Sequence, residues 1–192
     1  MHRALLLEKL RNYCPSPEEA AHKDRMIDFI QNNPDCFERT LETGHITASC
    51  WLLNKAGTHI LLTHHKKLGM WLQLGGHCDG DHDVVRVALK EAQEESGIMH
   101  IAPVSADIFD IDIHLIPESK KEKAHYHYDV RFLLQVMSDE EIVISDESHD
   151  LRWFSNDAQE LPQVDSSVLR MFDKWRMQPA GKDSSCAISY QK

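Results

Sequence analysis

The sequence lacks a long apolar run. Its first apolar cluster, at positions 4–7, ends at Glu8, which is too short for a membrane-spanning helix or for the apolar part of a secretory signal. Cysteines are also few and unpatterned, because the five are odd in number and show neither metal-ligand nor redox spacing. These absences argue against a membrane partner and lead us to expect a cytoplasmic protein.

Basic residues are a minority among the charged ones. The 21 Lys and Arg are outnumbered by 31 Asp and Glu, so the formal net charge is -10. Nucleic acids are held by clustered Lys and Arg, so no nucleic-acid partner is expected. A small anionic substrate stays compatible with this charge if a cation bridges it. Thirteen histidines are spread from His2 to His149, and we expect most to be ordinary surface or strand residues.

The length of 192 residues suits one domain. Helices are predicted at the start of the chain. Ser16-Pro17-Glu18-Glu19 combines an N-cap serine, a proline at the first helical position and a glutamate at the third. A helix should therefore begin there and end near Asn32. With a shorter helix near residues 3–12, it makes residues 1–43 a helical N-terminal extension, which could serve a homodimer interface.

From residue 44 the pattern changes to strands. Five β-prone segments follow, at residues 46–53, 59–63, 108–115, 126–134 and 151–154. A closing helix is expected after its N-cap Asp165. We therefore predict an α/β fold with a mixed sheet packed between helices. The main domain should cover residues 44–178 and be followed by a flexible polar tail over 179–192.

Among the strands lies a glycine-rich loop followed by one strongly patterned helix. The loop runs from Gly75 to Asp83, which caps the helix Val84–Ser96, and Gly97 supplies the left-handed residue that ends it. The expected apolar stripe consists of Val85, Ala88, Leu89 and Ala92. An adjoining face carries three carboxylates at positions i, i+3 and i+4, namely Glu91, Glu94 and Glu95.

Three carboxylates at this spacing repel one another, and a bound cation would reduce that repulsion. Mg2+ is the natural candidate, because it prefers hard oxygen ligands and is commonly shared between carboxylates and substrate phosphates. A solvated acidic helix face is the alternative, and spacing alone leaves both open.

The complete sequence motif from Gly76 to Ile98 favours the metal site. Gly76-x5-His82-x7-Lys90-Glu91-Ala92-x-Glu94-Glu95-x-Gly97-Ile98 resembles the Nudix box, G-x5-E-x7-R-E-U-x-E-E-x-G-U with U apolar. Seven of its nine specified positions match when Ala92 counts as apolar. The resemblance implies a Nudix-type α/β/α sandwich. It also implies a Mg2+-dependent hydrolase that cleaves the diphosphate bond of a nucleoside diphosphate linked to another group, such as a nucleotide sugar or an ADP-ribose-like molecule.

Two positions depart from the family pattern. His82 stands where the family has Glu, and Lys90 stands where it has Arg; in the family these two side chains pair and support the following glutamate. Lysine lacks the planar fork of arginine, and neutral histidine cannot accept a salt bridge. Nearby Asp79, Asp81 or Asp83 could take over the pairing.

By the resemblance, Glu94 and Glu95 are the principal ligands of Mg2+, with Mn2+ as an alternative ion. Glu91 is a further ligand or the base that activates water, and the Gly75 carbonyl is a backbone ligand. Some Nudix members take the base from a later loop. Glu147 is our candidate for that role, and the other interpretation of this residue is an ordinary acidic turn.

A row of polar residues on one predicted strand could line the substrate cleft. Alternation places His125, His127, Asp129 and Arg131 on the same face. Arg131 and the two histidines could contact the phosphate or sugar of a small-molecule nucleotide substrate, although a solvent-facing strand explains them equally well. His77 could reach the metal or a phosphate from the glycine-rich loop.

Two rival functions stay open. An enzyme resembling isopentenyl diphosphate isomerase would need a cysteine, for which Cys50 and Cys78 are available, but the histidine pattern of that enzyme is not found at the N-terminus. A non-catalytic nucleotide sensor would explain the altered His82 and Lys90. Retention of all three helix glutamates argues against the sensor.

Overall fold

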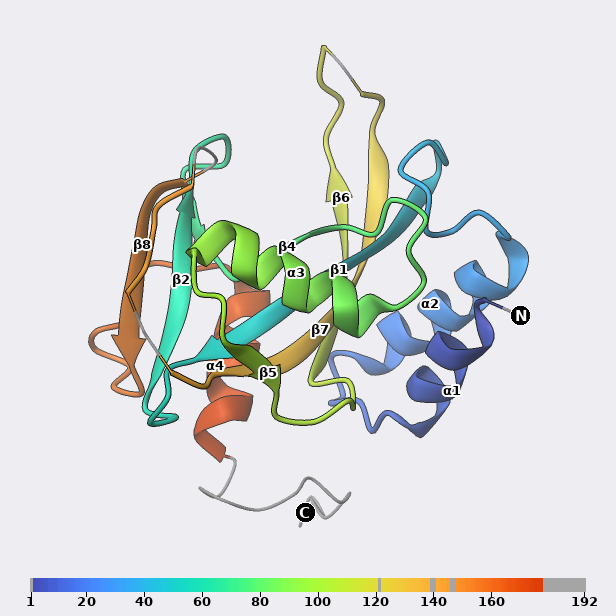
Figure 1. Cartoon of the computed structure of the whole chain (residues 1–192). Helices are drawn as coiled ribbons and strands as arrows, with labels where there is room; N and C mark the ends of the chain where they lie inside the picture. Colours follow the sequence, from blue (N-terminus) through green and yellow to red (C-terminus); the bar gives the residue numbers. More distant parts are fainter. Residues whose placement is uncertain (1, 121, 139–140, 146–147, 178–192) are drawn as a thin grey trace.

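The computed structural model describes residues 2–120, 122–138, 141–145 and 148–177 (Figure 1). The helices in these ranges are α1 (Ala4–Asn12), α2 (Ala20–Asn32), α3 (Val84–Ser96) and α4 (Ser166–Met177). The strands are β1 (Gly44–Leu53), β2 (His59–His65), β3 (Met70–Leu72), β4 (Leu74–His77), β5 (Ile101–Pro103), β6 (Asp110–Ile116), β7 (His125–Val136) and β8 (Ser148–Ser155). No helix in the described part of the chain is long and apolar enough to cross a membrane.

Strand β1 is the centre of a mixed sheet. It pairs in parallel with β7 along its whole length, from Gly44 opposite Tyr126 to Leu53 opposite Gln135. It also pairs antiparallel with β4 and, near its end, with β2. Strands β5 and β6 pair with β7, whereas β3 and β8 pair with β2. The mixed sheet predicted from the sequence is confirmed.

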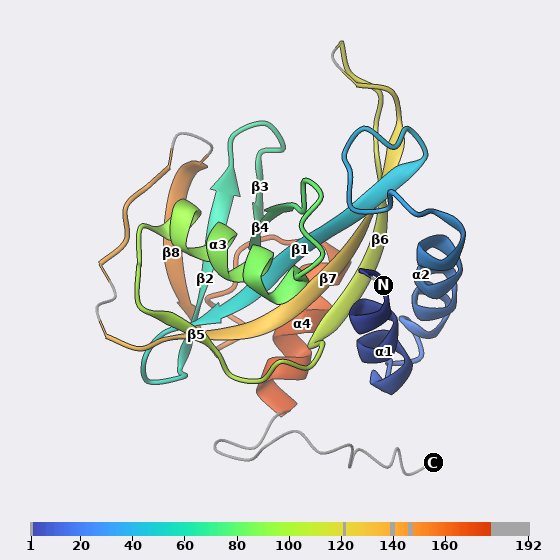
Figure 2. The ribbon, with the colours of Figure 1, turned by 45° about the vertical axis from the view of Figure 1, so that its right-hand side comes forward.

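Helices cover the sheet on both sides. Helix α3 crosses one face in front of β1, and α4 lies behind the sheet; the rotated view in Figure 2 shows the same layers. An apolar cluster on the α4 side contains Trp51, Leu133 and Phe172. The larger cluster contains Val87 and Ala92 of α3 together with residues of β1 and β7. The α/β/α architecture predicted from the sequence is thus confirmed.

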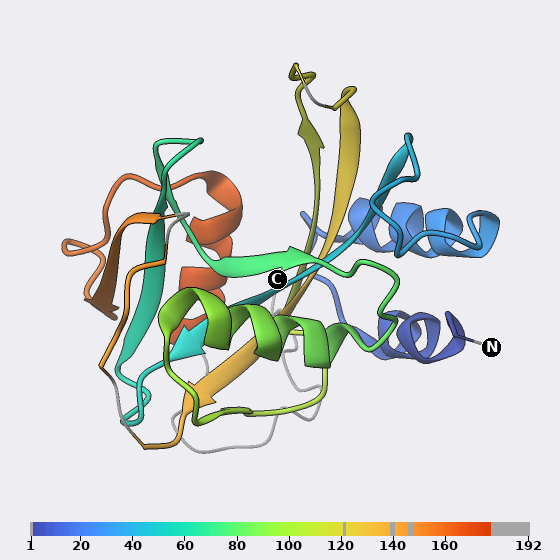
Figure 3. The ribbon, with the colours of Figure 1, turned by 45° about the horizontal axis from the view of Figure 1, so that its top comes forward.

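The N-terminal extension shares the core of the sheet. Helices α1 and α2 lie beside the end of the sheet formed by β6 and β7 (Figure 3). Leu6 and Ile30 are buried in the same cluster as β1 and β7. The ring of Phe29 stacks on that of Tyr128 with 3.8 Å between centroids. The extension therefore completes the apolar core.

The expected start of the second helix is wrong by three residues. Residues 17–19 form a turn, and α2 begins at Ala20. The carboxylate of Glu19 accepts a hydrogen bond from the Ser16 N–H at 2.8 Å, as a capping box requires. Its other oxygen points into the core and accepts a hydrogen bond from Lys174 at 2.6 Å. The capping contact at Ser16 is thus formed, and residues 17–19 are a turn that leads into α2.

Helix α3 has the predicted bounds and caps. The Asp83 side chain accepts a hydrogen bond from the Arg86 N–H, and Gly97 has a φ of 75°. The buried stripe consists of Val84, Val87, Ala88, Ala92 and Ser96. Val85 and Leu89 were expected in this stripe but are only partly buried, because α3 turns the Val84 side toward β1 and β4.

Candidate active site

Two glycines of β4 allow its backbone to meet the acidic face of α3. The Gly75 N–H donates a hydrogen bond to Glu95 Oε1 at 3.3 Å. A Cβ on Gly76 would lie 2.6 Å from Glu91 Oε2, and one on Gly75 would lie 2.2 Å from the Cβ of Ser49. A side chain at Gly75 would collide with the backbone of β1, and one at Gly76 would displace the Glu91 carboxylate, so the two glycines let the backbone and the carboxylates come into direct contact. The structure thus brings together Gly75, Glu91 and Glu95.

Lys90 joins two of the glutamates. Its Nζ lies 3.6 Å from Glu91 Oε1 and 3.4 Å from Glu94 Oε2. The charge of Glu91 raises the pKa of Lys90. The Glu94 side chain is 59% exposed whereas that of Glu91 is 17% exposed, so Glu91 is the more firmly held of the two.

The expectation that a nearby aspartate pairs with Lys90 is wrong. Asp79 forms a two-pronged ion pair with Arg39, and Asp81 accepts a hydrogen bond from Arg86 at 2.6 Å. Asp83 is used as the cap of α3. Each of the three has another partner, and Lys90 instead contacts the glutamates themselves.

A histidine cluster lies next to the glycine pair. In the described part of the chain, one group of three possible metal ligands has ligand atoms that all lie within 4.8 Å of one another, namely His45, His77 and His127. They come from β1, β4 and β7, where His45 is opposite His127 and His77 is opposite Thr47. Three adjacent strands of the sheet therefore fix their positions.

The imidazoles of this cluster are held neutral. Burial, with the neighbouring histidines, lowers the pKa of His45 to about 4 and that of His127 to about 2. Burial and then the charge of Arg39 lower the pKa of His77. Near neutral pH each ring consequently keeps one nitrogen lone pair.

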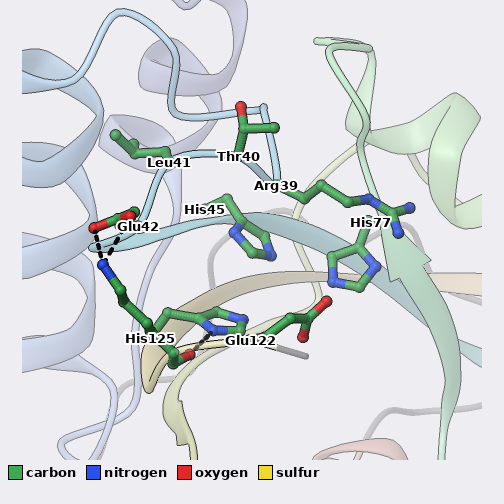
Figure 4. Close-up of a pocket in the computed structure, with 9 residues that line it drawn as sticks. Arg39, Thr40, Leu41, Glu42, His45, His77, Glu122 and His125 are labelled. Atoms are coloured by element: carbon green, nitrogen blue, oxygen red, sulfur yellow. Dashed lines mark hydrogen bonds and ion pairs between the residues drawn. The ribbon is translucent and has the colours of Figure 1, made fainter. Parts of the chain in front are cut away.

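A pocket opens over the cluster (Figure 4). Its lining consists of Arg39, Thr40, Leu41, Glu42, His45, His77, Glu122, Lys123 and His125. The rings of His45, His77 and His125 point toward its interior. Lys123 pairs with Glu42 at 3.0 Å. Two of the predicted substrate-binding residues, His77 and His125, thus line the pocket, and His127 lies beside them.

Arg131 lies elsewhere, although it shares the predicted face of β7. Its side chain is 2% exposed and donates to Asp129 at 2.7 Å, Asp110 at 3.2 Å and Ser167 at 3.1 Å. Burial alone would lower the pKa of Arg131, but the charges of Asp129 and Asp110 raise it. This guanidinium is bound within the protein beneath α4 and is not part of the pocket lining.

Three other candidate residues of the sequence analysis, Glu147, Cys50 and Cys78, do not line the pocket as far as the structure describes them. Glu147, the candidate loop base, lies outside the described residues. Cys50 and Cys78 are buried, and burial raises the pKa of both thiols. Buried, protonated thiols do not support the isomerase alternative, which needs an accessible cysteine.

Most of the pocket lining was not predicted by the sequence analysis, and His45 and Arg39 show why. His45 has no motif around it and becomes recognisable only when β1 is paired with β7 in the observed register. Arg39 belongs to the turn before β1 and lines the pocket while paired with Asp79. Strand register and loop position, which a single sequence does not reveal, bring both residues to the site.

The family model of the NUDIX domain matches residues 43–174. A comparison with curated protein sequences found no match. Among solved structures, the chain is similar to a MutT NUDIX hydrolase from Burkholderia pseudomallei, with 22% identity and a TM-score of 0.53 over 69% of this chain and 98% of that chain.

Two further structures have the same fold. An Ap4A hydrolase from C. elegans has 17% identity and a TM-score of 0.53, over 68% of this chain and 94% of that chain. A MutT protein from Methanosarcina mazei has 20% identity and a TM-score of 0.51, over 71% of this chain and 95% of that chain.

Proposed function

Because the chain belongs to the Nudix hydrolase family, we propose that it hydrolyses the diphosphate bond of a nucleoside diphosphate linked to another group. The observation that carries this proposal is the contact between β4 and α3, where Gly75 and Gly76 lie directly against Glu95 and Glu91. That contact joins a backbone segment free of side chains to a row of carboxylates, an arrangement suited to binding a divalent cation together with phosphate.

The donor set fits Mg2+, with Mn2+ as an alternative ion. Glu91, Glu94, Glu95 and the Gly75 carbonyl would hold it, since all four offer the hard oxygen atoms that this ion prefers. When bound, the ion neutralises diphosphate oxygens and lowers the pKa of a water molecule that attacks phosphorus. Lys90 holds Glu91 and Glu94 from the solvent side, and we assign it the supporting role of the family arginine.

The remaining groups orient the substrate and accept the proton. Glu91 is the candidate base within the described residues, and Glu147 is the candidate from the later loop. His77, His125 and His127 are our candidates for contacting the substrate, because the first two line the pocket and the third hydrogen-bonds to His125. We assign Arg131 a structural role, because it donates hydrogen bonds to the buried Asp129 and Asp110.

The pocket favours a polar group beyond the diphosphate. Its lining contains charged, hydroxyl and imidazole side chains and no Phe, Tyr or Trp, so it offers hydrogen bonds and few stacking surfaces. A sugar fits this lining better than a second base does. We therefore propose a nucleotide sugar or an ADP-ribose-like molecule as the substrate.

Replacing Glu95 tests the proposal. The Glu95→Gln variant keeps the volume of the side chain but removes a charge, so turnover should fall by roughly a hundredfold or more while the fold is retained. The measurement is chromatographic product analysis with ADP-ribose, nucleotide sugars, dinucleoside polyphosphates and nucleoside triphosphates, with Mg2+ present or chelated. Glu118→Gln, on an exposed residue away from α3, is the matched control.

Either outcome is informative. Metal-dependent release of a nucleoside monophosphate, lost in Glu95→Gln and kept in Glu118→Gln, would support the proposal and identify the substrate class. A folded protein that binds one of these nucleotides but cleaves none would favour the nucleotide sensor, for which the altered His82 and Lys90 are the supporting observation.

A further inference from the structure

We propose that His45, His77 and His127 form a second metal site, which binds a divalent transition metal such as Zn2+ and is separate from the carboxylate site on α3. The three side chains offer nitrogen ligands that all lie within 4.8 Å of one another. Their ring centroids are 4.9–5.0 Å apart in every pair. Small movements of these rings would bring three nitrogens within bonding distance of one ion.

His45 provides an independent observation. It is only 2% exposed, and neither of its ring nitrogens has a hydrogen-bond partner in the described part of the chain. A buried polar group without a partner is destabilising. A metal ion between His45 and its two neighbours would satisfy one nitrogen and explain why a histidine occupies this position of β1.

His125 supports the cluster from outside. Its Nδ1 lies 2.8 Å from the Lys123 carbonyl oxygen, which can only accept, so Nδ1 carries the proton. Nε2 of His125 lies 3.3 Å from His127 Nε2 and is hydrogen-bonded to it. An outer partner that orients a ligating histidine is a regular feature of metal sites.

The imidazole ligands determine which metal ions this site would prefer. Imidazole nitrogen suits Zn2+, Ni2+ and Cu2+, whereas Mg2+ prefers oxygen. Three protein ligands also leave a coordination position open, as in catalytic zinc sites. Since His45 and His77 line the pocket, that position would take an anionic oxygen of the substrate. The histidines would then contact the substrate through the ion.

Metal binding without nucleotide tests this inference separately from hydrolysis. Full-length protein stripped with a chelator is titrated with Zn2+ by calorimetry and with Co2+ by visible absorption. The test variants are His127→Gln and His77→Gln, and both should weaken Zn2+ binding by about 100-fold or more. His100→Gln, on an exposed histidine outside the cluster, is the matched control, and Glu95→Gln separates the two metal sites.

Wild type, His100→Gln and Glu95→Gln should each bind one equivalent of Zn2+ and give the intense absorption of tetrahedral Co2+. Equal affinity of wild type and both cluster variants would overturn the inference, as would no Zn2+ binding by the wild type. Loss of binding in Glu95→Gln alone would place the ion at the carboxylates and also overturn it. Failure of substrate cleavage would leave the result unaffected, because no turnover is measured.

Discussion

At the scale of single residues, Gly76 decides whether Glu91 can reach the site. A methyl group added to Gly76 would lie 2.6 Å from Glu91 Oε2 and 2.7 Å from Glu91 Cδ, which are its nearest atoms. Gly76 has no positive φ, so alanine is acceptable to the backbone at this position. The three nearest atoms therefore all belong to the carboxylate group that we propose as metal ligand or base.

We expect Gly76→Ala to displace Glu91 and to lower kcat/KM by roughly 10- to 100-fold, with a higher Mg2+ concentration needed for half-maximal rate. Gly69→Ala is the control, because a methyl group there meets nothing within 4 Å but the residue has a φ of +63°. It should lower the free energy of unfolding by about 1 kcal/mol, because a left-handed backbone is unfavourable for a residue with a Cβ, and leave the rate unchanged. Equal rates for wild type and Gly76→Ala would show that Glu91 is not needed in its present position.

At the scale of elements, β7 divides its polar face into two parts. His125 and His127 belong to the pocket and its histidine cluster. Further along the same face, Arg131 donates to Ser167 of α4, and Asp129 accepts hydrogen bonds from Arg131 and from Thr47 and Ser49 of β1, the last two at 2.9 and 2.6 Å. One part of the strand thus serves the candidate site and the other stabilises the fold.

Arg131→Met tests this division. Removing the guanidinium leaves Asp129 and Asp110 buried with fewer cationic partners, and breaking a buried ion pair from one side costs about 3–5 kcal/mol. Arg152→Met is the control, because Arg152 is 66% exposed and pairs with Asp150 at the surface; its effect should be below about 1 kcal/mol. Urea unfolding followed by tryptophan fluorescence measures both. Wild-type stability of Arg131→Met together with a raised KM would restore Arg131 as a substrate-binding residue.

The sequence analysis correctly predicted the elements whose sequence signals, such as caps and alternation, lie within the element itself. Helix α3 begins at its Asp83 cap and ends before Gly97 as expected, and alternation placed His125 and Arg131 on one face of β7. Alternation does not say what covers that face, so the burial of Arg131 by α4 was not foreseen. His45 was missed for a similar reason, since its neighbours come from β4 and β7, far away in sequence.

At the scale of the whole molecule, the N-terminal extension is tied to the sheet by a buried charge. Glu19 is fully buried and accepts hydrogen bonds from Tyr13, from Lys174 of α4 and from the Ile111 N–H. Lys174 also donates to Asp110 at 2.7 Å. Deleting the extension would remove the Glu19 carboxylate from Lys174 and from the Ile111 N–H, and it would expose the core. Truncation is therefore a poor test of whether the extension forms a dimer interface, and a point variant is more informative.

Glu19→Gln should lower the free energy of unfolding by about 1.5–3 kcal/mol at neutral pH, because it removes one of the two carboxylates that pair with Lys174 while Asp110 remains. Burial alone would raise the pKa of Glu19, but the charge of Lys174 and the hydrogen bonds from Lys174 and Tyr13 lower it to about 2. The groups facing this carboxylate also include the charged Asp110 and Arg170. A carboxylate whose pKa is lower in the folded than in the unfolded protein stabilises the fold at pH values above the unfolded-state pKa. It loses that contribution as the pH falls toward the folded-state pKa.

The stability difference between wild type and Glu19→Gln should therefore be constant above pH 4.5 and shrink as pH falls toward about 2. Urea titrations at several pH values measure it, and Glu8→Gln, on an exposed residue of α1, should show no such pH-dependent gap. A gap that stays constant down to about pH 2 would mean that Asp110 alone compensates Lys174. Glu19 would then act through the shape and hydrogen bonds of its side chain, which glutamine only partly reproduces, and its negative charge would not be what ties the extension to the sheet.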